Sequence, residues 1–97
     1  MSVYLVTFPS ASASFIANSL NGVATGLGKM RGVNGFCILP NGGILLSDDG
    51  SQSANSLKRA LGSGMGALVA RLEGEWSTSS GTPSDVPAWL HSAAPAF

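Results

Sequence analysis

Two glutamates at the end of an apolar run, Glu73 and Glu75, come nearest in type and spacing to a catalytic pair. Residues two apart in an extended strand point to the same side, so the two carboxylates would be near enough to share a proton or a cation. The same pattern arises from two solvated residues at a strand end, one of them pairing with Arg71 or with a residue of a neighbouring chain. We favour this second interpretation and keep both glutamates as weak acid candidates.

The other residue types that carry chemistry occur singly. His91 lies in the C-terminal segment beside Ser92, and no Gly-x-Ser-x-Gly motif accompanies it, so we interpret it as an exposed tail histidine. Cys37 is the one cysteine and lies in an apolar run, which indicates a buried thiol rather than a reactive one. The sequence shows no spacing typical of zinc ligands. We therefore predict no catalytic residue, no metal site and no cofactor.

Four of the five basic residues are candidates for contacts with an anion or a nucleic acid: Lys29, Arg31, Lys58 and Arg59. They would lie together if the ends of two helices approach the same edge of a sheet, and such a patch can touch a few phosphates. Ordinary solvated helix faces explain the same residues. The glycine-rich stretches 26–29 and 62–66 follow expected helices, so we interpret them as helix ends and turns rather than as phosphate loops.

The composition limits the class of protein. Of the 97 residues, 44% are hydrophobic and 10% are charged, against about 25% charged in an average domain. A chain of this length fits one domain with one core. Five basic and five acidic residues cancel, so no overall positive field attracts nucleic acid and little repulsion opposes self-association. No stretch is long and apolar enough to span a membrane, so we expect a cytoplasmic protein that forms a homodimer.

The apolar pattern in the first half of the chain predicts three strands and a helix. A nearly continuous apolar strand at 3–8 ends at Pro9, which cannot donate to a sheet. Serines at positions 10, 12 and 14 offer N-caps for a helix whose apolar stripe runs from Phe15 to Leu27. Runs at 35–39 and 44–46 flank an Asn-Gly pair and predict a β-hairpin.

The second half predicts another helix, with Ala54, Leu57, Leu61 and Met65 on one face, and then a half-buried strand at 67–73. The order strand, helix, strand, strand, helix, strand predicts an α+β, ferredoxin-like βαββαβ fold. In that fold two helices cover one face of a four-stranded antiparallel sheet. We assign residues 1–76 to this core. Residues 77–97 form a C-terminal tail, whose segment 86–90 packs on the sheet or on a partner subunit.

Two stretches resemble the SinR-like family of small ferredoxin-like proteins. One is Val-Tyr-Leu-Val-Thr at 3–7, and the other is 68–76, which contains Arg-Leu-x-Gly-Glu-Trp; a proline-containing segment ending in Trp89-Leu90 follows. That family is similar in fold to CRISPR-associated adaptation endonucleases and to VapD-type toxins. The resemblance implies a ferredoxin-like dimer and, in the related nucleases, an aspartate just after the first strand on the dimer axis.

In this sequence the stretch after the first strand is Thr7-Phe8-Pro9-Ser10, without the acid. Two carboxylates facing each other across a dimer can hold a divalent metal for phosphodiester cleavage, whereas hydroxyls are poor ligands without carboxylate help. This departure leaves enzyme activity uncertain and favours a protein that is not an enzyme.

Large aromatic and apolar residues are the candidates for an interface: Tyr4, Trp76, Trp89 and Leu90. The two tryptophans either hold the tail on the sheet or anchor a partner subunit. The sequence thus favours a non-enzymatic accessory or regulatory interaction module that acts as a homodimer. Two alternatives stay open: a metal-dependent nuclease or toxin, and a binder of nucleotides, nucleic acid or other small anions at a subunit interface.

Overall fold

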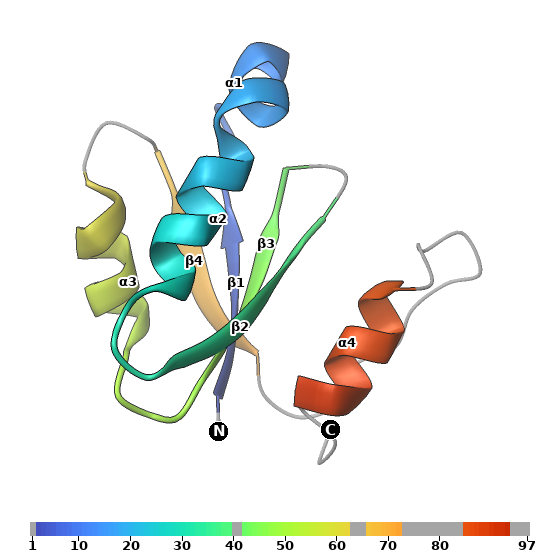
Figure 1. Cartoon of the computed structure of the whole chain (residues 1–97). Helices are drawn as coiled ribbons and strands as arrows, with labels where there is room; N and C mark the ends of the chain where they lie inside the picture. Colours follow the sequence, from blue (N-terminus) through green and yellow to red (C-terminus); the bar gives the residue numbers. More distant parts are fainter. Residues whose placement is uncertain (1, 40–41, 63–65, 73–84, 94–97) are drawn as a thin grey trace.

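The structure is a four-stranded antiparallel sheet with helices on both faces (Figure 1). This computed structural model describes residues 2–39, 42–62, 66–72 and 85–93. The strands are β1 Ser2–Thr7, β2 Val33–Ile38, β3 Ile44–Asp48 and β4 Leu68–Leu72. The helices are α1 Ala13–Asn18, α2 Leu20–Gly28, α3 Ala54–Leu61 and α4 Asp85–Ala93. The predicted α+β class, with a four-stranded antiparallel sheet, is confirmed.

The strand order is β2-β3-β1-β4, and each strand is antiparallel to its neighbours. β1 is central, because it pairs with β3 on one side and with β4 on the other. Val3, Tyr4 and Val6 are all buried, as the nearly continuous apolar run in β1 predicts. β2 and β4 are therefore the two edge strands.

The larger hydrophobic core lies between the sheet and the layer formed by α2 and α3. Alternate residues of β1 and β3 face these helices, as the two-residue period of a strand requires. The helices contribute residues spaced three or four apart. The buried members of this core are Tyr4, Val6, Phe8, Leu20, Ala24, Leu27, Ile44, Leu46, Leu57 and Leu61.

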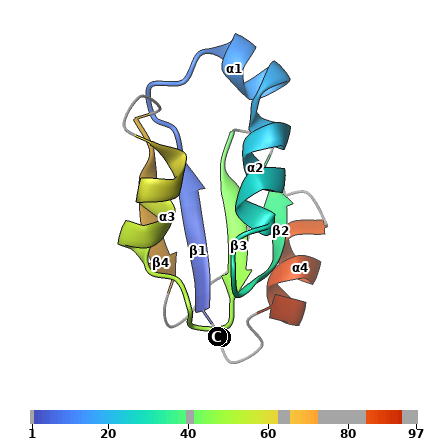
Figure 2. The same cartoon turned by 60° about the vertical axis from the view of Figure 1, so that its left-hand side comes forward.

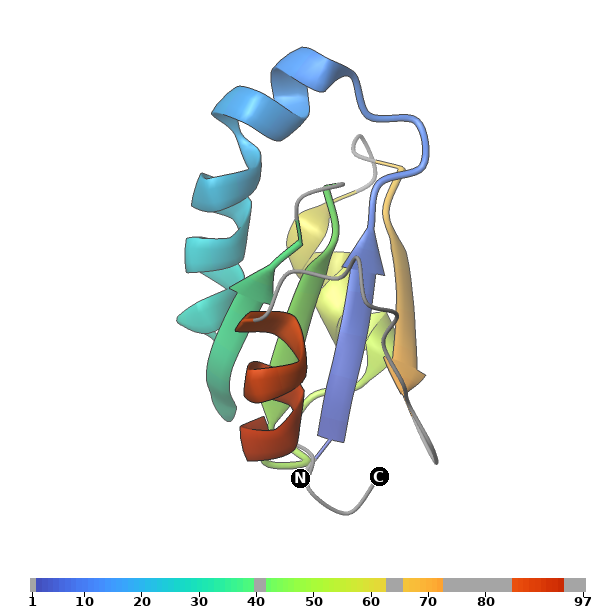
Figure 3. The same ribbon diagram turned by 90° about the vertical axis from the view of Figure 1, so that its right-hand side faces the viewer.

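The opposite face of the sheet is partly covered by α4. Figure 3 shows α4 in front of the sheet and α3 behind it. Val86 and Leu90 of α4 are buried against Val3, Cys37 and Leu45. The segment expected at 86–90 thus lies within a longer helix, and this helix packs on the sheet of its own chain.

The helix expected between Phe15 and Leu27 is two helices, α1 and α2, separated at Ser19. Ser12 caps α1 by accepting a hydrogen bond from the backbone N–H of Phe15, in line with the predicted serine caps. The two parts of the apolar stripe serve different surfaces. Phe15 lies against Phe8, with ring centroids 5.3 Å apart, whereas Leu20 begins the part that lies on the sheet.

The predicted hairpin joins β2 and β3, although residues 40 and 41 lie outside the described part. Gly42 has φ +96°, and a Cβ there would lie 2.9 Å from Cδ1 of Ile16 in α1. Glycine is therefore required both by the backbone and by the close approach of α1. The second predicted helix is α3, which begins with a capping box between Ser53 and Ser56. It ends at Leu61, and Met65 lies outside the described residues.

Candidate interaction surface

The edge strand β4 carries the exposed apolar residues of the sheet. Leu68 is 58% exposed, and among the described residues it is the large hydrophobic residue that is exposed to solvent. Ala70 is also exposed, and Leu72 is half-buried. The register with β1 places these three residues opposite Thr7, Leu5 and Val3, on the face that carries α4. We call Leu68, Ala70 and Leu72 the β4 edge surface.

The two edges of the sheet differ in regularity. β4 pairs with β1 through five consecutive residues without a bulge, so its outer backbone groups follow a regular strand. β2 has an irregularity between Val33 and Gly35 in its pairing with β3. Bulges at an edge hinder the addition of another strand, whereas a regular edge is a template for one. Of the two edges, β4 is the one suited to pair with a further strand.

A basic hollow adjoins the N-terminal end of β4. Lys58 and Arg59, in the last turn of α3, line it together with Gly62 and Ala67, and its volume is about 460 Å³. Figure 1 shows α3 beside β4 at this side of the sheet. The structure therefore places two cations next to the regular edge.

The four predicted basic residues form two pairs rather than one patch. Lys29 and Arg31 follow α2, where the carbonyl oxygen of Arg31 accepts a hydrogen bond of 2.7 Å from Nε2 of Gln52, just before α3. Lys58 and Arg59 lie in the last turn of α3. Arg31 thus lies beside the start of α3, and Lys58 and Arg59 lie in its last turn. With 1.5 Å of rise per residue, these two places are roughly 10 Å apart along the axis of α3. Figure 2 shows α2 and α3 side by side, with the end of α2 near the start of α3.

The turn between β3 and α3 contains a buried carboxylate that the sequence analysis did not single out. Asp48 is 0% exposed, and its Oδ2 accepts hydrogen bonds from the backbone N–H groups of Gly50 at 2.9 Å and Gln52 at 3.2 Å. Its Oδ1 is buried and has no hydrogen-bond partner among the described residues. The signal in the sequence was the alternation Ile44, Leu46, Asp48, which puts all three on the buried side of β3.

Asp49, next along the chain, is exposed and organises the same turn. Its Oδ1 accepts hydrogen bonds from both Oγ and the backbone N–H of Ser51, at 2.5 and 2.9 Å. These bonds, the one from the Ser51 hydroxyl first, hold the pKa of Asp49 below its usual 3.8, with a smaller contribution from the charge of Arg31. Gly32 lies against this turn with φ +84°, and a Cβ there would be 2.5 Å from Oδ1 of Asp49. The hydrogen bonds of Asp49 therefore explain the tight turn, and its closeness to Gly32 explains the glycine at that position.

A lowered pKa makes the contribution of Asp49 to stability depend on pH. The contribution is fully present above the unfolded-state value of 3.8 and is lost as the pH falls through the lower folded-state pKa. We expect the urea midpoint of the wild type to exceed that of Asp49→Asn near pH 6, and the difference to vanish near about pH 2. Urea unfolding across that range checks this. A difference that stays constant with pH would show that the carboxylate is not involved. Ser51→Ala removes the hydroxyl that donates to Asp49, so in that background Asp49→Asn should lower the urea midpoint near pH 6 by less.

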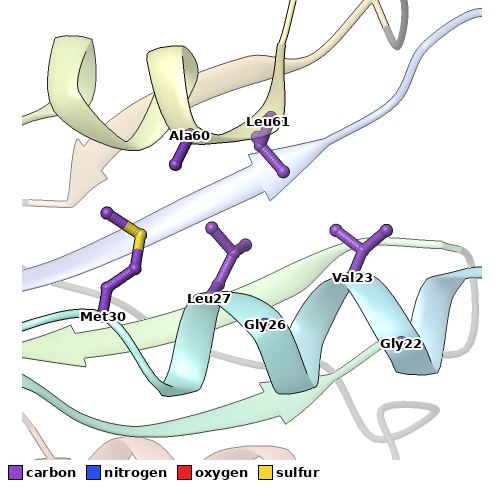
Figure 4. Close-up of a pocket in the computed structure, with 7 residues that line it drawn as sticks. All are labelled: Gly22, Val23, Gly26, Leu27, Met30, Ala60 and Leu61. Atoms are coloured by element: carbon purple, nitrogen blue, oxygen red, sulfur yellow. The ribbon is translucent and has the colours of Figure 1, made fainter.

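A groove between α2 and α3 is the apolar hollow of the helix layer (Figure 4). Figure 4 shows Val23, Leu27 and Met30 of α2 pointing toward Ala60 and Leu61 of α3. Its volume is about 240 Å³, and its described lining also includes Gly22 and Gly26. None of these residues has a polar side chain that could orient a ligand or transfer a proton. The described lining of the groove can therefore bury apolar groups.

The end of β1 is the position at which the resemblance to nucleases implies an acid. A hollow of about 310 Å³ is lined there by residues that include Thr7, Phe8 and Pro9, none of them charged. Asp48 pairs with Ser2, at the opposite end of β1. The described carboxylates of β3 and its turn therefore lie at the other end of the sheet. Among the described residues no group of three or more His, Cys, Asp or Glu could hold a metal ion.

The predicted interface residues have different environments. Tyr4 is 2% exposed in the core under the helices, and its hydroxyl donates a hydrogen bond of 2.9 Å to the carbonyl oxygen of Gln52. Leu90 is buried and Trp89 half-buried, both in the contact between α4 and the sheet. The candidates Glu73, Glu75 and Trp76 lie outside the described residues.

The two single residues of the sequence analysis are also placed. Cys37 is buried on the α4 side of the sheet, as its apolar context predicts. His91 is exposed in α4. In the described part of the chain, none of the helices has the length and apolar character needed to cross a membrane.

Within the described ranges, the features that stand out are thus a regular exposed edge, a basic hollow beside it and a buried aspartate in a turn. No protein-family model, no curated protein and no solved structure matches the chain at a significant level.

Proposed function

We propose that the protein is a non-enzymatic interaction module that works as a homodimer and associates through the β4 edge surface. The observation that carries this proposal is Leu68, a leucine that is 58% exposed on a regular edge strand. An exposed edge with an apolar side chain can add a strand from another chain, which satisfies its backbone groups and buries the leucine. The cancelling charges of the sequence leave little repulsion against a second copy.

The arrangement of strands supports a ferredoxin-like fold for this module. β1 and β2 run parallel with β3 between them, and β3 and β4 run parallel with β1 between them. Each such pair is joined through a helical segment, which is the split βαβ pattern. The similarity of residues 3–7 and 68–76 to the SinR-like family, together with the dimer that this similarity implies, is part of the same proposal.

The nuclease alternative receives less support from the described residues. Metal-dependent cleavage needs carboxylates that converge on one point, and the end of β1 offers Thr7 and apolar neighbours. The oxygen atoms Oδ2 of Asp48 and Oδ1 of Asp49 already accept hydrogen bonds within their own turn. The alternative of an anion binder would use the hollow beside Lys58 and Arg59, which is one more outcome for the experiment below.

The test is the molar mass of the purified protein by light scattering over a series of concentrations. We expect a dimer, and we expect Leu68→Lys to raise its dissociation constant by about 100-fold. Each buried leucine contributes about 1.5 kcal/mol, and a symmetric dimer buries two. Asn21→Lys, which adds the same charge at an exposed position of α2, is the matched control and should leave the dimer intact.

A wild type that stays monomeric at high concentration would refute the proposal. Addition of short RNA, DNA and nucleotides, with and without Mg²⁺, tests the alternatives in the same samples. Cleavage, or a saturable binding that Arg59→Ala abolishes, would favour them instead.

A further inference from the structure

We propose that α4 is an autoinhibitory cover: it leaves the sheet while the rest of the domain stays folded, and the apolar face that it uncovers pairs with the same face of a second copy. The surface concerned is a face of the sheet and not its β4 edge, so this pairing does not depend on the dimer proposed above. The structure shows the closed state, in which α4 packs on the sheet of its own chain.

The contact between α4 and the sheet is small. Among the described residues of α4, Val86 and Leu90 are buried, and Trp89 packs half-buried beside them. Figure 3 shows α4 on one face of the sheet, whereas α2 and α3 lie together on the other face and support each other across their groove. A helix of nine residues is not stable by itself in water, so α4 depends on this contact. Elements with few buried apolar contacts are the ones that open locally.

Departure of α4 leaves the main part of the domain intact. The strand pairings use residues between 2 and 72, so none of them is broken when α4 leaves. The main core, which includes Leu46 and Leu57, lies on the other face, between the sheet and the layer of α2 and α3. The opening of α4 therefore requires less than the unfolding of the whole domain.

The face under α4 is apolar. Val3, Cys37 and Leu45 are buried in the contact with α4, and Leu5 and Leu39 pack against its margin. Their registers place them on the same side of the sheet. Release of α4 would expose these side chains to water, which is unfavourable unless another apolar surface covers them.

This face continues into the β4 edge surface. Leu72 belongs to that surface and also packs against the α4 contact, and the register places Ala70 opposite Leu5. By the same registers, every described strand residue that points to this side is uncharged, whereas Asp48 and Arg71 point to the other side. With α4 away, one uncharged face extends from β2 to β4.

The occupant of the open face is a second copy of this chain, with its own α4 released. A flat uncharged face can meet itself about a two-fold axis without bringing like charges together. Two sheets pack face to face about 10 Å apart and bury the side chains of both inner faces. The cancelling charges of the sequence leave little repulsion between the copies.

The closed state limits this pairing by mass action. Only open chains can pair, and two of them are needed, so the apparent affinity falls with the square of the open fraction. Weakening the contact of α4 should therefore increase self-association, although it removes apolar packing from the protein. This direction is the opposite of what α4 would cause as a simple stabilising element.

The first experiment releases α4 in the full-length protein through Val86→Asp with Leu90→Asp. We expect light scattering to give twice the molar mass of the wild type at the same concentration, whichever mass the wild type has. Ala88→Asp with Ser92→Asp is the matched control, since it adds the same charges at the same spacing on exposed positions of α4. The control should keep the mass of the wild type. Circular dichroism shows that each variant is folded.

The second experiment measures the opening itself in a milder variant. Cys37, the one cysteine of the chain, is buried under α4, so a disulfide reagent such as dithiobis(nitrobenzoate) reacts with it when α4 is away. Leu90→Ala should speed this reaction about 30-fold, because the lost packing favours opening. Leu57→Ala, the same change in the main core on the other face, should leave the rate within about two-fold of the wild type.

The outcomes are separate for the opening and for the pairing. If Leu57→Ala and Leu90→Ala speed the reaction equally, Cys37 is reached by unfolding of the whole domain, and the separate opening of α4 is overturned. If the double aspartate variant exposes Cys37 but keeps the mass of the wild type, or if its mass grows without limit, the pairing of two open faces is overturned.

The β4 dimer is judged on other results. A monomeric wild type refutes that dimer, whereas a twofold mass of the double aspartate variant would still support the pairing of open faces. Conversely, a wild-type dimer that Leu68→Lys dissociates stands even if release of α4 changes nothing.

Discussion

Replacing Leu57 with alanine is expected to lower the free energy of unfolding by about 3 kcal/mol. Leu57 is 0% exposed and belongs to the main core, where α3 lies over the sheet. The substitution removes buried methyl groups and leaves a cavity, because the surrounding side chains relax only in part. The helix α3 has eight residues, and Leu57 and Leu61 are the two that are buried. A helix this short depends on such packing for its stability, so the loss of Leu57 should affect it strongly.

Urea unfolding followed by circular dichroism measures this loss. Leu68→Ala is the matched control: it is the same chemical change, made at a leucine that is 58% exposed. Measured in dilute monomeric samples, it should cost well under about 1 kcal/mol. Equal losses at the two positions would contradict the burial of Leu57 and would put the placement of α3 on the sheet in doubt.

Replacing Asp48 with alanine is expected to have a comparable effect, a loss of about 3 kcal/mol, through hydrogen bonds rather than packing. Its Oδ2 is the acceptor for the N–H groups of Gly50 and Gln52, and alanine would leave these donors without it. The turn that they form carries the carbonyl group of Gln52, to which the Tyr4 hydroxyl donates. The damage should therefore extend from the turn to the first strand.

Asp48→Asn separates the shape of this side chain from its charge. The amide oxygen can still accept both backbone hydrogen bonds, and the amide nitrogen replaces Oδ1, which has no hydrogen-bond partner among the described residues. We expect Asp48→Asn to lie within about 1 kcal/mol of the wild type in the same urea measurement. If it is as destabilising as alanine, the negative charge itself is required at this position.

Most of the helices and strands could be predicted from the sequence because their signals are local. The apolar run at 3–8, the Asn-Gly pair between two apolar runs, and the serines before Phe15 each indicate one element and its end. The separation of α1 from α2 at Ser19 could not be predicted this way. The stripe from Phe15 to Leu27 keeps its spacing through the break, and only the positions of Phe8 and the sheet show that its two halves have different partners.

Only part of the candidate surface could be predicted from the sequence. The alternation at 68–72 correctly separates Leu68, Ala70 and Leu72 from Val69 and Arg71. Whether the first group is covered depends on where α4 lies, and its contacts with Val3, Cys37 and Leu45 join segments distant in the sequence. The same limit applies to the basic residues, since the orientation of α3 decides that Lys58 and Arg31 lie apart.

The central position of β1 has a consequence for the order of folding. Its partners β3 and β4 come much later in the chain, and Val3 pairs with Leu72. The hairpin of β2 and β3 closes a short loop and can form early, whereas the pairing of β1 with β4 must close a loop of most of the chain. During synthesis, therefore, this central strand waits unpaired on one side until residues near 72 have left the ribosome. A β1 strand in that state exposes the same kind of edge that the finished protein presents at β4.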